Sequence, residues 1–360
     1  MHLSLSENIS DRQKNQRVKI NKEVKRLYCR NKVPKRTMIL CGFFVLLLFV
    51  LTGCIWGKDI TTEEDKSDPA KEGAAAGERK ALLVKDQELV VVYFATSDRK
   101  NLVPVTLSIK PTNEAAKIAV EKLLAGPVND FSLPTIPEGT KLKDLYLQGN
   151  TAYVDLTKQL LETSEELAQQ TIDALVFTLT EFPTVNDVQI LIDGQIKESI
   201  GDVDISKPIA RPQTINYYGK KTPGKNLAKV FYADNNAMYL VPVTLEVSGK
   251  NPPLSALEKL VAGPPEESGL IPTVWEGTGI NSLHIENGLA TVDFNAEVLG
   301  YGGGSAAETL LVNSVLCTLT QFDEVQGVQF LIDGGKIEYF PEGTDASSPL
   351  SAPHKINFLE

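Results

Sequence analysis

Residue types that usually carry metal binding and catalysis are scarce in this chain of 360 residues. It contains four cysteines and three histidines, and only 7% of its residues are aromatic. Cys29 and Cys41 lie in a basic leader, which leaves Cys54 and Cys317, too few for a disulfide framework or a zinc site. Because His284 is the one histidine outside the leader and the C-terminal tail, histidine-based catalysis has almost no side chains to work with.

Net positive charge is lacking beyond the first 37 residues. The chain carries a net charge of -10, but residues 1–37 alone hold eleven basic and three acidic side chains, a net of +8. Residues 38–54 hold no charge, so the remainder carries -18. An acidic body repels phosphate groups, and we therefore expect no nucleic-acid partner.

The basic segment precedes an apolar run over 38–51 and the residues Thr52-Gly53-Cys54. This order is typical of an export signal. Residues 51–54 also resemble a bacterial lipobox, which implies cleavage before Cys54 and attachment of a lipid to its sulfur. We assign residues 1–54 to a basic leader and lipoprotein signal peptide, with the lipid holding the protein at the outer face of the cytoplasmic membrane.

An uncleaved transmembrane helix is the alternative anchor. The uncharged run over 37–57 is close to the ~20 residues that span a bilayer. Basic residues before it would keep the N-terminus inside, so the body lies outside the cytoplasm with either anchor. Residues 55–87 begin with a charged stretch that is poor in large apolar side chains, and we expect them to form a disordered tether.

An internal repeat organises the rest of the chain. Its period is 137–140 residues, and 141 in the tails, which is the size of a domain, so the pattern indicates a tandem duplication rather than a solenoid of short units. The clearest matches are 102–107 with 240–245, 124–127 with 261–264, 134–140 with 272–278, 152–156 with 290–294, 177–182 with 317–322, 191–194 with 331–334, and the tails 208–217 with 349–358.

Each copy is predicted to be a small α+β domain in which two helices pack on one face of a small mixed or antiparallel sheet of three or four strands. We place the first domain at 88–218, a linker at 219–226 and the second domain at 227–360. Thr163 with Glu166, and Ser305 with Glu308, match the capping box that opens a helix. We expect each tail to run extended and to dock its Ile-Asn-aromatic end on its own domain.

Acidic residues that recur in both copies are the main candidates for chemistry. Asp155 and Asp293 each stand at the end of a strand, and two Asp-Gly pairs, Asp193-Gly194 and Asp333-Gly334, each follow a strand. Repeated carboxylates could serve as acid–base or metal groups. Asp also bonds nearby backbone N–H groups, and Asp-Gly forms tight hairpins, so we interpret all six residues as structural.

The second copy departs from the first at three places. A glycine-rich stretch occupies 300–304, but it does not fit a phosphate-binding motif and is interpreted as a loop. Cys317 replaces Phe177 in an apolar helix stripe, which favours a core residue over a nucleophile. Trp275 replaces Pro137, either as an exposed anchor for a partner or as a buried staple.

Short motifs in a shared order resemble the GerMN domain of the GerM family of sporulation and germination lipoproteins. These are Ala-Gly-Pro after the first helix, Glu-Gly-Thr before a hairpin, Ala-x-Val-Asp-Leu/Phe and the Asp-Gly turn. The resemblance implies a non-catalytic protein of endospore-forming bacteria. It also implies similarity to ring-building domains of the channel between mother cell and forespore, in the space between the two membranes.

Two classes of function follow. The first is an oligomerising structural lipoprotein that contacts itself or other proteins of a sporulation complex. The second is an envelope module that binds peptidoglycan or peptide, or that assists a cell-wall hydrolase. We favour the first because aromatic residues are few, and we expect no cofactor, no metal and no small-molecule substrate.

Overall fold

The computed structural model describes residues 79–84, 87–219, 224–300, 302–354 and 356–359. Cys54, the rest of the predicted leader and residues 55–78 of the predicted tether lie outside these ranges. The elements of the first repeat are β1 (Lys80–Ala81), β2 (Gln87–Thr96), β3 (Leu102–Thr112), α2 (Ala115–Ala125), β4 (Ser132–Leu133), β5 (Leu142–Gln148), β6 (Thr151–Leu156), the 3-10 helix η1 (Lys158–Glu162), α3 (Glu165–Leu179), β7 (Asp187–Ile192), β8 (Ser199–Ile200), β9 (Val203–Asp204) and β10 (Ile209–Ala210).

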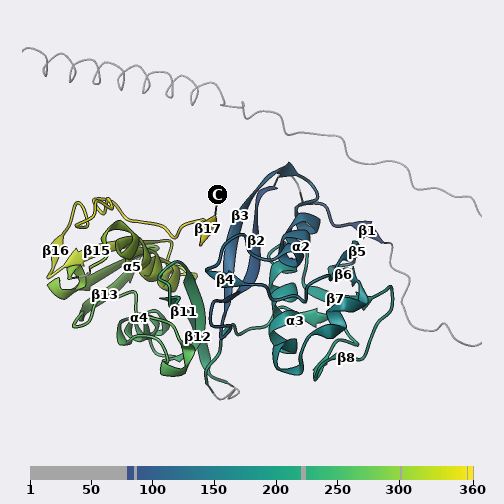
Figure 1. Ribbon diagram of the computed structural model, residues 1–360. Coiled ribbons are helices and arrows are strands. Elements are labelled where there is room, and N and C mark those ends of the chain that lie inside the picture. Colours follow the sequence, from purple (N-terminus) through teal and green to yellow (C-terminus); the bar gives the residue numbers. More distant parts are fainter. Residues whose placement is uncertain (1–78, 85–86, 220–223, 301, 355, 360) are drawn as a thin grey trace, which may run out of the picture. The chain divides into compact units, whose positions relative to one another are not determined.

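The second repeat runs through the same plan, which confirms the predicted α+β class and the tandem duplication (Figure 1). Its elements are β11 (Asn226–Ala233), β12 (Leu240–Val247), α4 (Pro252–Ala262), η2 (Glu266–Ser268), β13 (Ile280–Glu286), β14 (Leu289–Phe294), η3 (Ala296–Leu299), α5 (Gly304–Leu319), β15 (Gly327–Ile332), β16 (Gly335–Lys336) and β17 (Phe358–Leu359).

The main strands of each repeat form two sheets rather than the single sheet expected, and β8 and β9 of the first repeat form a further small sheet. In the first repeat, β2 and β3 form a hairpin, and β5, β6 and β7 form a separate sheet. Helices α2 and α3 lie between the two and pack against both (Figure 1). The reason is visible in α3, where every residue from Ala174 to Leu179 is buried. A helix that is covered on all sides needs packing partners on all sides.

The larger sheet is mixed, which decides between the two predicted alternatives, mixed or antiparallel. Strands β5 and β6 pair antiparallel, whereas β6 and β7 pair in parallel across the α3 crossover. Strands β13, β14 and β15 repeat this order. Its inner face carries Val154 and Ile190 in the first repeat and Val292 and Phe330 in the second, all of them buried. The Cα registers Val154↔Ile190 and Val292↔Phe330 show that the two cores are built at matching positions.

The predicted tether ends earlier than expected. Lys80 and Ala81 form β1 and pair with Leu147 and Tyr146 of β5. Leu82 is buried, and the guanidinium of Arg79 lies 4.6 Å from the centre of the Tyr146 ring. The sequence suggested disorder because the side chains of residues 73–80 are small or charged. The open edge of β5 nevertheless provides a pairing partner for β1.

The predicted capping boxes are wrong. Helix α3 begins after Ser164 and α5 begins after Gly303, and neither cap residue makes a side-chain bond to the helix. Glu308 instead lies one turn inside α5 and is 1% exposed. Its carboxylate accepts bonds from the backbone N–H groups of Glu342 (2.6 Å) and Thr344 (2.8 Å), so it holds a distant loop rather than its own helix end.

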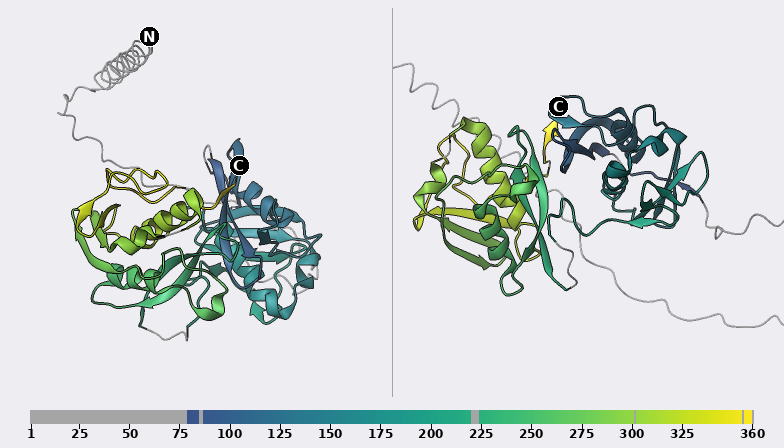
Figure 2. Two further views of the ribbon diagram at one scale, coloured as in Figure 1. Left: turned by 60° about the vertical axis from the view of Figure 1, so that its left-hand side comes forward. Right: turned by 60° about the horizontal axis from the view of Figure 1, so that its bottom comes forward.

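The two tails cross between the repeats, which corrects the expectation that each docks on its own domain. The first tail bonds to β12 of the second repeat, where the backbones of Ile215 and Thr244 are joined. The second tail forms β17, which pairs in parallel with β3 of the first repeat. In both views of Figure 2 the yellow C-terminal strand lies along the blue strands of the first repeat.

Two asparagines hold this crossing together. The Asn216 side chain donates to the carbonyls of Leu102 (2.7 Å) and Pro242 (2.8 Å) and accepts from the N–H of Leu102 (2.7 Å). Asn357 makes the same three bonds, to the carbonyls of Leu240 and Pro104 and from the N–H of Leu240. Each asparagine therefore bridges the second hairpin strand of its own repeat to that of the other. Asn suits this position, because Asn216 has φ 50 and Asn357 has φ 53, in the left-handed region.

Candidate functional site

The repeated aspartates at the strand ends bind their own backbone. Asp155 accepts a hydrogen bond from the N–H of Gly194 at 2.8 Å, and Asp293 accepts one from Gly334 at 2.9 Å. The structure thus brings each strand-end aspartate together with the Asp-Gly turn of the same repeat. These contacts join the end of β6 to the turn after β7, and the end of β14 to the turn after β15. Such bonds to nearby backbone are what a structural role requires.

The Asp-Gly turns have positive φ at both residues. Asp193 and Gly194 have φ 50 and 78, and Asp333 and Gly334 have φ 47 and 76. This is the conformation of a type I′ hairpin turn, for which Asp-Gly is a preferred pair. The Asp193 carboxylate also forms an exposed ion pair with Lys143 at 3.0 Å. An exposed pair of this kind adds little to stability.

Cys317 and His284 are the remaining reactive side chains that the sequence singled out. Burial raises the pKa of the Cys317 thiol in α5 to about 12, so it is a poor nucleophile at neutral pH. His284 lies in β13, and its Nε2 is 3.6 Å from the carboxylate of the exposed Glu286. Within the described ranges, no group of three or more His, Cys, Asp or Glu side chains is placed to hold a metal ion. No described helix is both long enough and apolar enough to cross a bilayer.

A pocket of about 400 Å³ opens where the two repeats and the two tails meet. We call it the junction pocket. Both hairpins and both tails contribute to its walls, together with the ends of α3 and α5. The side chains that matter here are Val91, Tyr93, Phe177, Glu181 and Arg211 from the first repeat, and Lys229, Phe231, Cys317, Gln321 and Ala352 from the second.

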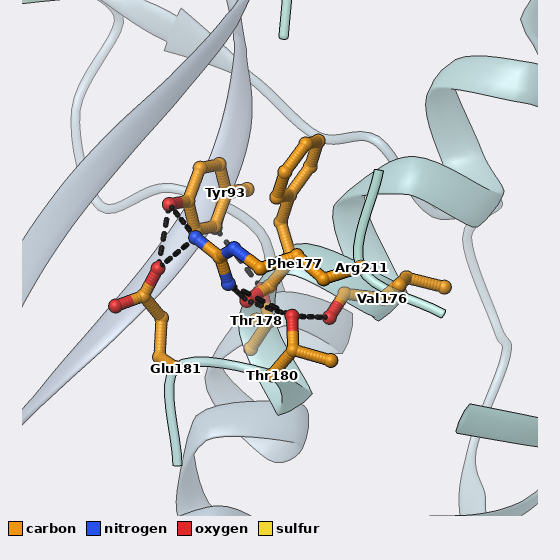
Figure 3. Close-up of polar contacts among 7 residues, drawn as sticks. All are labelled: Tyr93, Val176, Phe177, Thr178, Thr180, Glu181 and Arg211. Carbon is orange, nitrogen blue, oxygen red and sulfur yellow. Dashed lines mark hydrogen bonds and ion pairs between the residues drawn. The ribbon is translucent and has the colours of Figure 1, made fainter. Parts of the chain in front are cut away.

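Arg211 lines the part of the pocket built by the first repeat and contacts several of its other side chains (Figure 3). Its guanidinium donates to Glu181 (2.5 Å) and Tyr93 (3.1 Å) through one nitrogen. Through the other it donates to the Phe177 carbonyl (3.1 Å) and the Thr180 hydroxyl (2.8 Å). The guanidinium also lies over the Phe177 ring, 4.9 Å from its centre.

Tyr93 completes this cluster. Its hydroxyl donates to Glu181 at 2.7 Å, and its ring stacks on that of Phe177 at 5.1 Å. Burial, reinforced by the nearby Glu181 carboxylate, raises the pKa of Tyr93 far above its usual value. The phenol therefore stays protonated and keeps donating to Glu181, whose charge is shared between Tyr93 and Arg211.

At two of the equivalent positions, the second repeat has much smaller side chains. Aligning the repeats places Ala352 where the first has Arg211, Cys317 where it has Phe177, Phe231 where it has Tyr93 and Gln321 where it has Glu181. The Gln321 amide accepts from the N–H of Lys229 (2.8 Å) and donates to its carbonyl (2.6 Å). Gln321 thereby fixes the backbone from which the Lys229 side chain extends.

Lys229 stands where the first repeat has Val91. It alternates along β11 with the buried Ala228 and Val230, so its side chain leaves the strand on the face away from the repeat's own core. The Lys229 side chain is exposed to solvent. Partial desolvation by the surrounding protein lowers its pKa, Arg211 lowers it further, and Glu181 partly offsets the shift. Among the described residues, the ammonium has no hydrogen-bond or ion-pair partner.

Trp275 takes a position between its two predicted roles. It is 46% exposed, so it is not a buried staple, but its indole covers the backbone of Gly300. A methyl group at Gly300 would approach the indole to 2.8 Å, which explains the small residue there. Trp275 also lines a second pocket of about 280 Å³, with Ala306, Ala307 and Leu310 of α5.

Sequence reasoning did not single out Arg211 or Lys229. Neither belongs to a recognisable motif, and each differs between the two copies rather than recurring. The differences themselves were the available signal, since Val91 is replaced by a charged residue while Arg211 is replaced by a methyl group. A search for recurring residues finds the side chains that stabilise each domain. It passes over functional side chains that only one domain has.

Comparison with known proteins agrees with this architecture. The model of the family described as "Germane: Sporulation and spore germination" matches residues 91–198 and 229–338. The chain is 28% identical to "Spore germination protein GerM" of Bacillus subtilis over 319 residues, which covers 82% of this chain and 83% of that protein. A solved structure described as the tandem GerMN domains of the B. subtilis sporulation protein GerM matches with a TM-score of 0.59 and 24% identity, covering 76% of this chain and 99% of that one.

Proposed function

Since the chain belongs to the Germane family of sporulation and spore-germination proteins, we propose that it is a non-catalytic lipoprotein that forms a structural part of an envelope complex. In this proposal it is anchored through Cys54 at the outer face of the cytoplasmic membrane. During sporulation it lies in the space between mother cell and forespore, where it assembles with further copies of itself or with partner proteins.

The crossing of the tails is the observation that carries this proposal. Asn216 and Asn357 each tie both hairpins together, so the two repeats form one closed body. A scaffold has to present its contact surfaces at a fixed separation, whereas an enzyme that closes on a substrate needs a hinge. The repeated carboxylates support the same proposal, because Asp155 and Asp293 are engaged with their own backbone.

Sedimentation of the chain from residue 55 onward tests the assembly. We expect species larger than a dimer to appear as the concentration rises, alone or on lipid vesicles. A monomer at every concentration in both settings would contradict self-assembly and would leave partner proteins as the only way into a complex.

Metabolic labelling with a fatty acid tests the anchor. The wild-type protein should be labelled and found in the membrane fraction. The Cys54→Ala variant should lose the label, whereas Cys41→Ala, in the same leader, should keep it. If Cys54→Ala remains at the membrane without label, the anchor is the uncleaved helix.

A second function is favoured by one specific observation, the half-exposed Trp275 beside an apolar pocket. Such an aromatic side chain is suited to bind a peptide or a sugar ring of the cell wall. In this alternative, Trp275→Ala should reduce co-sedimentation with purified peptidoglycan. Tyr339→Ala, which removes another exposed aromatic side chain of the same repeat, serves as the control and should have no effect.

A further inference from the structure

The junction pocket is built from positions that correspond in the two repeats but are filled differently. On the side of the first repeat, the Arg211 guanidinium and the Phe177 ring fill the space between hairpin and helix end. On the side of the second, a methyl group at Ala352 and a thiol at Cys317 stand at the same positions. These smaller side chains leave an opening of about 400 Å³ beside Lys229.

The charges around the pocket do not balance. Six titratable groups among the described residues line it: Tyr93, Glu181, Arg211, Lys229, Cys317 and His354. Cys317 stays an uncharged thiol at neutral pH because burial raises its pKa. Glu181 and Arg211 neutralise each other at 2.5 Å, and Tyr93 stays protonated because burial raises its pKa. His354 is exposed at the rim. Among the described residues that line the pocket, Lys229 is therefore the cationic group without an ion-pair partner, in a chain whose overall charge is negative.

The rest of the wall is largely apolar, with Thr106, Thr320 and Gln321 as its polar side chains. Pro104 and Pro242 come from the two hairpins, and Ile215 and Ile356 come from the two tails. The tails are fixed by neighbouring backbone bonds, so the wall keeps its shape. A pocket with largely apolar walls and a single unpaired charge favours a ligand with an apolar body and one opposite charge.

We propose that the junction pocket binds a small organic monoanion, with the carboxylate on Lys229 and an apolar chain between the two prolines. One unpaired ammonium matches one carboxylate, whereas a phosphate with two charges would call for a cluster of cationic groups or a forked arginine that is free to bind. Arg211 is not free, because both of its terminal nitrogens are already engaged. This inference goes beyond the structural role proposed above and does not depend on it.

The experiment titrates the chain from residue 55 onward with hexanoate and follows backbone amide resonances by NMR. Hexanoate should shift the amides of Lys229 and Phe231 in a saturable manner, with a Kd in the millimolar range. Hexanamide has the same apolar chain without the charge, and its affinity should be lower by at least about tenfold.

Two variants locate the site. Lys229→Val introduces the residue that the first repeat has at this position, so the strand should fold, and it should weaken hexanoate binding by about tenfold. Cys317→Phe restores the ring that the first repeat has and should block binding by filling the space. Lys225→Val is the matched control, because Lys225 precedes the same strand but pairs with Glu246, and it should bind hexanoate like the wild type.

The outcomes separate clearly. Saturable shifts that depend on both the carboxylate and Lys229 support the proposal. It would be overturned if hexanoate left the Lys229 and Phe231 amides unshifted, if hexanamide bound equally well, or if Lys229→Val bound with unchanged affinity while its spectrum showed a native fold. None of these results bears on self-assembly, which sedimentation reports.

Discussion

The ends of the two central helices are the most instructive pair of regions to compare. In the first repeat, the end of α3 is closed by Arg211, which engages Glu181 and lies over Phe177. In the second, the end of α5 carries Cys317, and the matching tail carries Ala352, so the helix end stays open. Both helix ends nevertheless bind their hairpin in the same way, through Thr178 to the N–H of Tyr93 and Thr318 to that of Phe231. The fold therefore depends on the shared bonds, and the divergent side chains are available for another purpose.

At the beginnings of the same helices, it is the second repeat that has the larger side chain. In the first repeat, Gly201 lies directly against Ala168, and a methyl group added to Gly201 would come within 2.8 Å of it. In the second repeat, Glu308 stands where Ala168 does and bonds the backbone of the loop through its buried carboxylate. A close backbone contact and a buried charged acceptor are thus two solutions to fixing the same loop on the same helix.

Substitutions of the two bridging asparagines should have the largest effect and test whether the two repeats are equivalent at the crossing. Asn357→Gly should lower the free energy of unfolding by about 3 kcal/mol, because three bonds to backbone groups are lost and glycine adopts the positive φ without strain. Asn216→Gly should cost about the same, since it makes the same bonds. Urea unfolding measures both.

Asn287→Gly is the control for these two variants. Asn287 also has a positive φ, of 52, but it is exposed in a turn. Its replacement should change the stability by less than about 0.5 kcal/mol. A large difference between Asn216→Gly and Asn357→Gly would contradict the symmetry of the crossing.

Glu308 is the second way to test the comparison. Glu308→Ala puts the first repeat's alanine on the second repeat's backbone and leaves the N–H groups of Glu342 and Thr344 without their acceptor. We expect a loss of about 2 kcal/mol in the free energy of unfolding. Glu165→Ala, in the first turn of α3, should have almost no effect. Equal losses in calorimetry would show that Glu308 acts only as a helix residue.

Arg211→Ala should open the first repeat's side of the junction pocket as Ala352 does in the second. The loss of its bonds to Glu181 and Phe177 should cost about 1.5 kcal/mol, less than the changes above because the side chain is partly exposed. Chemical denaturation monitored by near-UV circular dichroism would also report the loss of the stacked Tyr93 and Phe177 rings. An unchanged midpoint would mean that the cluster contributes nothing to stability.

Lys229→Val should have the smallest effect and the opposite sign. A lowered folded-state pKa means that the charged form is disfavoured on folding, so the penalty is present at neutral pH and fades as the pH rises through the folded pKa toward the ordinary lysine value. The variant should be slightly more stable than the wild type at pH 7, by less than about 0.5 kcal/mol, and equal to it above pH ~10.5. Thermal melts at both values check this. A destabilised variant at pH 7 would show that Lys229 makes a favourable contact.

Much of the fold could be predicted from the sequence, because recurring motifs mark positions that both copies need. The Asp-Gly turns at 193–194 and 333–334 followed from turn chemistry, whereas the strand pattern left a mixed and an antiparallel sheet as alternatives. The crossing of the tails could not be predicted. The segment containing Ile215 and Asn216 has the same local pattern whether it docks on its own hairpin or on the other one, and only the three-dimensional arrangement of the hairpins decides between them.

The pocket was missed for a related reason. Arg211 and Lys229 lie 18 residues apart in sequence yet line the same opening, together with Phe177 and Cys317 from two different helices. Their joint effect depends on the junction of the repeats, which no periodicity encodes. Glu308 shows the same limitation, because the spacing that suggested a capping box with Ser305 says nothing about a loop some 35 residues later.

The most direct test of the closed two-repeat body is whether it unfolds as a unit. Calorimetry of the wild-type chain from residue 55 onward should show a single cooperative transition. The double variant Asn216→Gly, Asn357→Gly should show two, one for each repeat, because the bridges between the hairpins are gone. Two transitions in the wild type, or one unchanged transition in the double variant, would contradict the account.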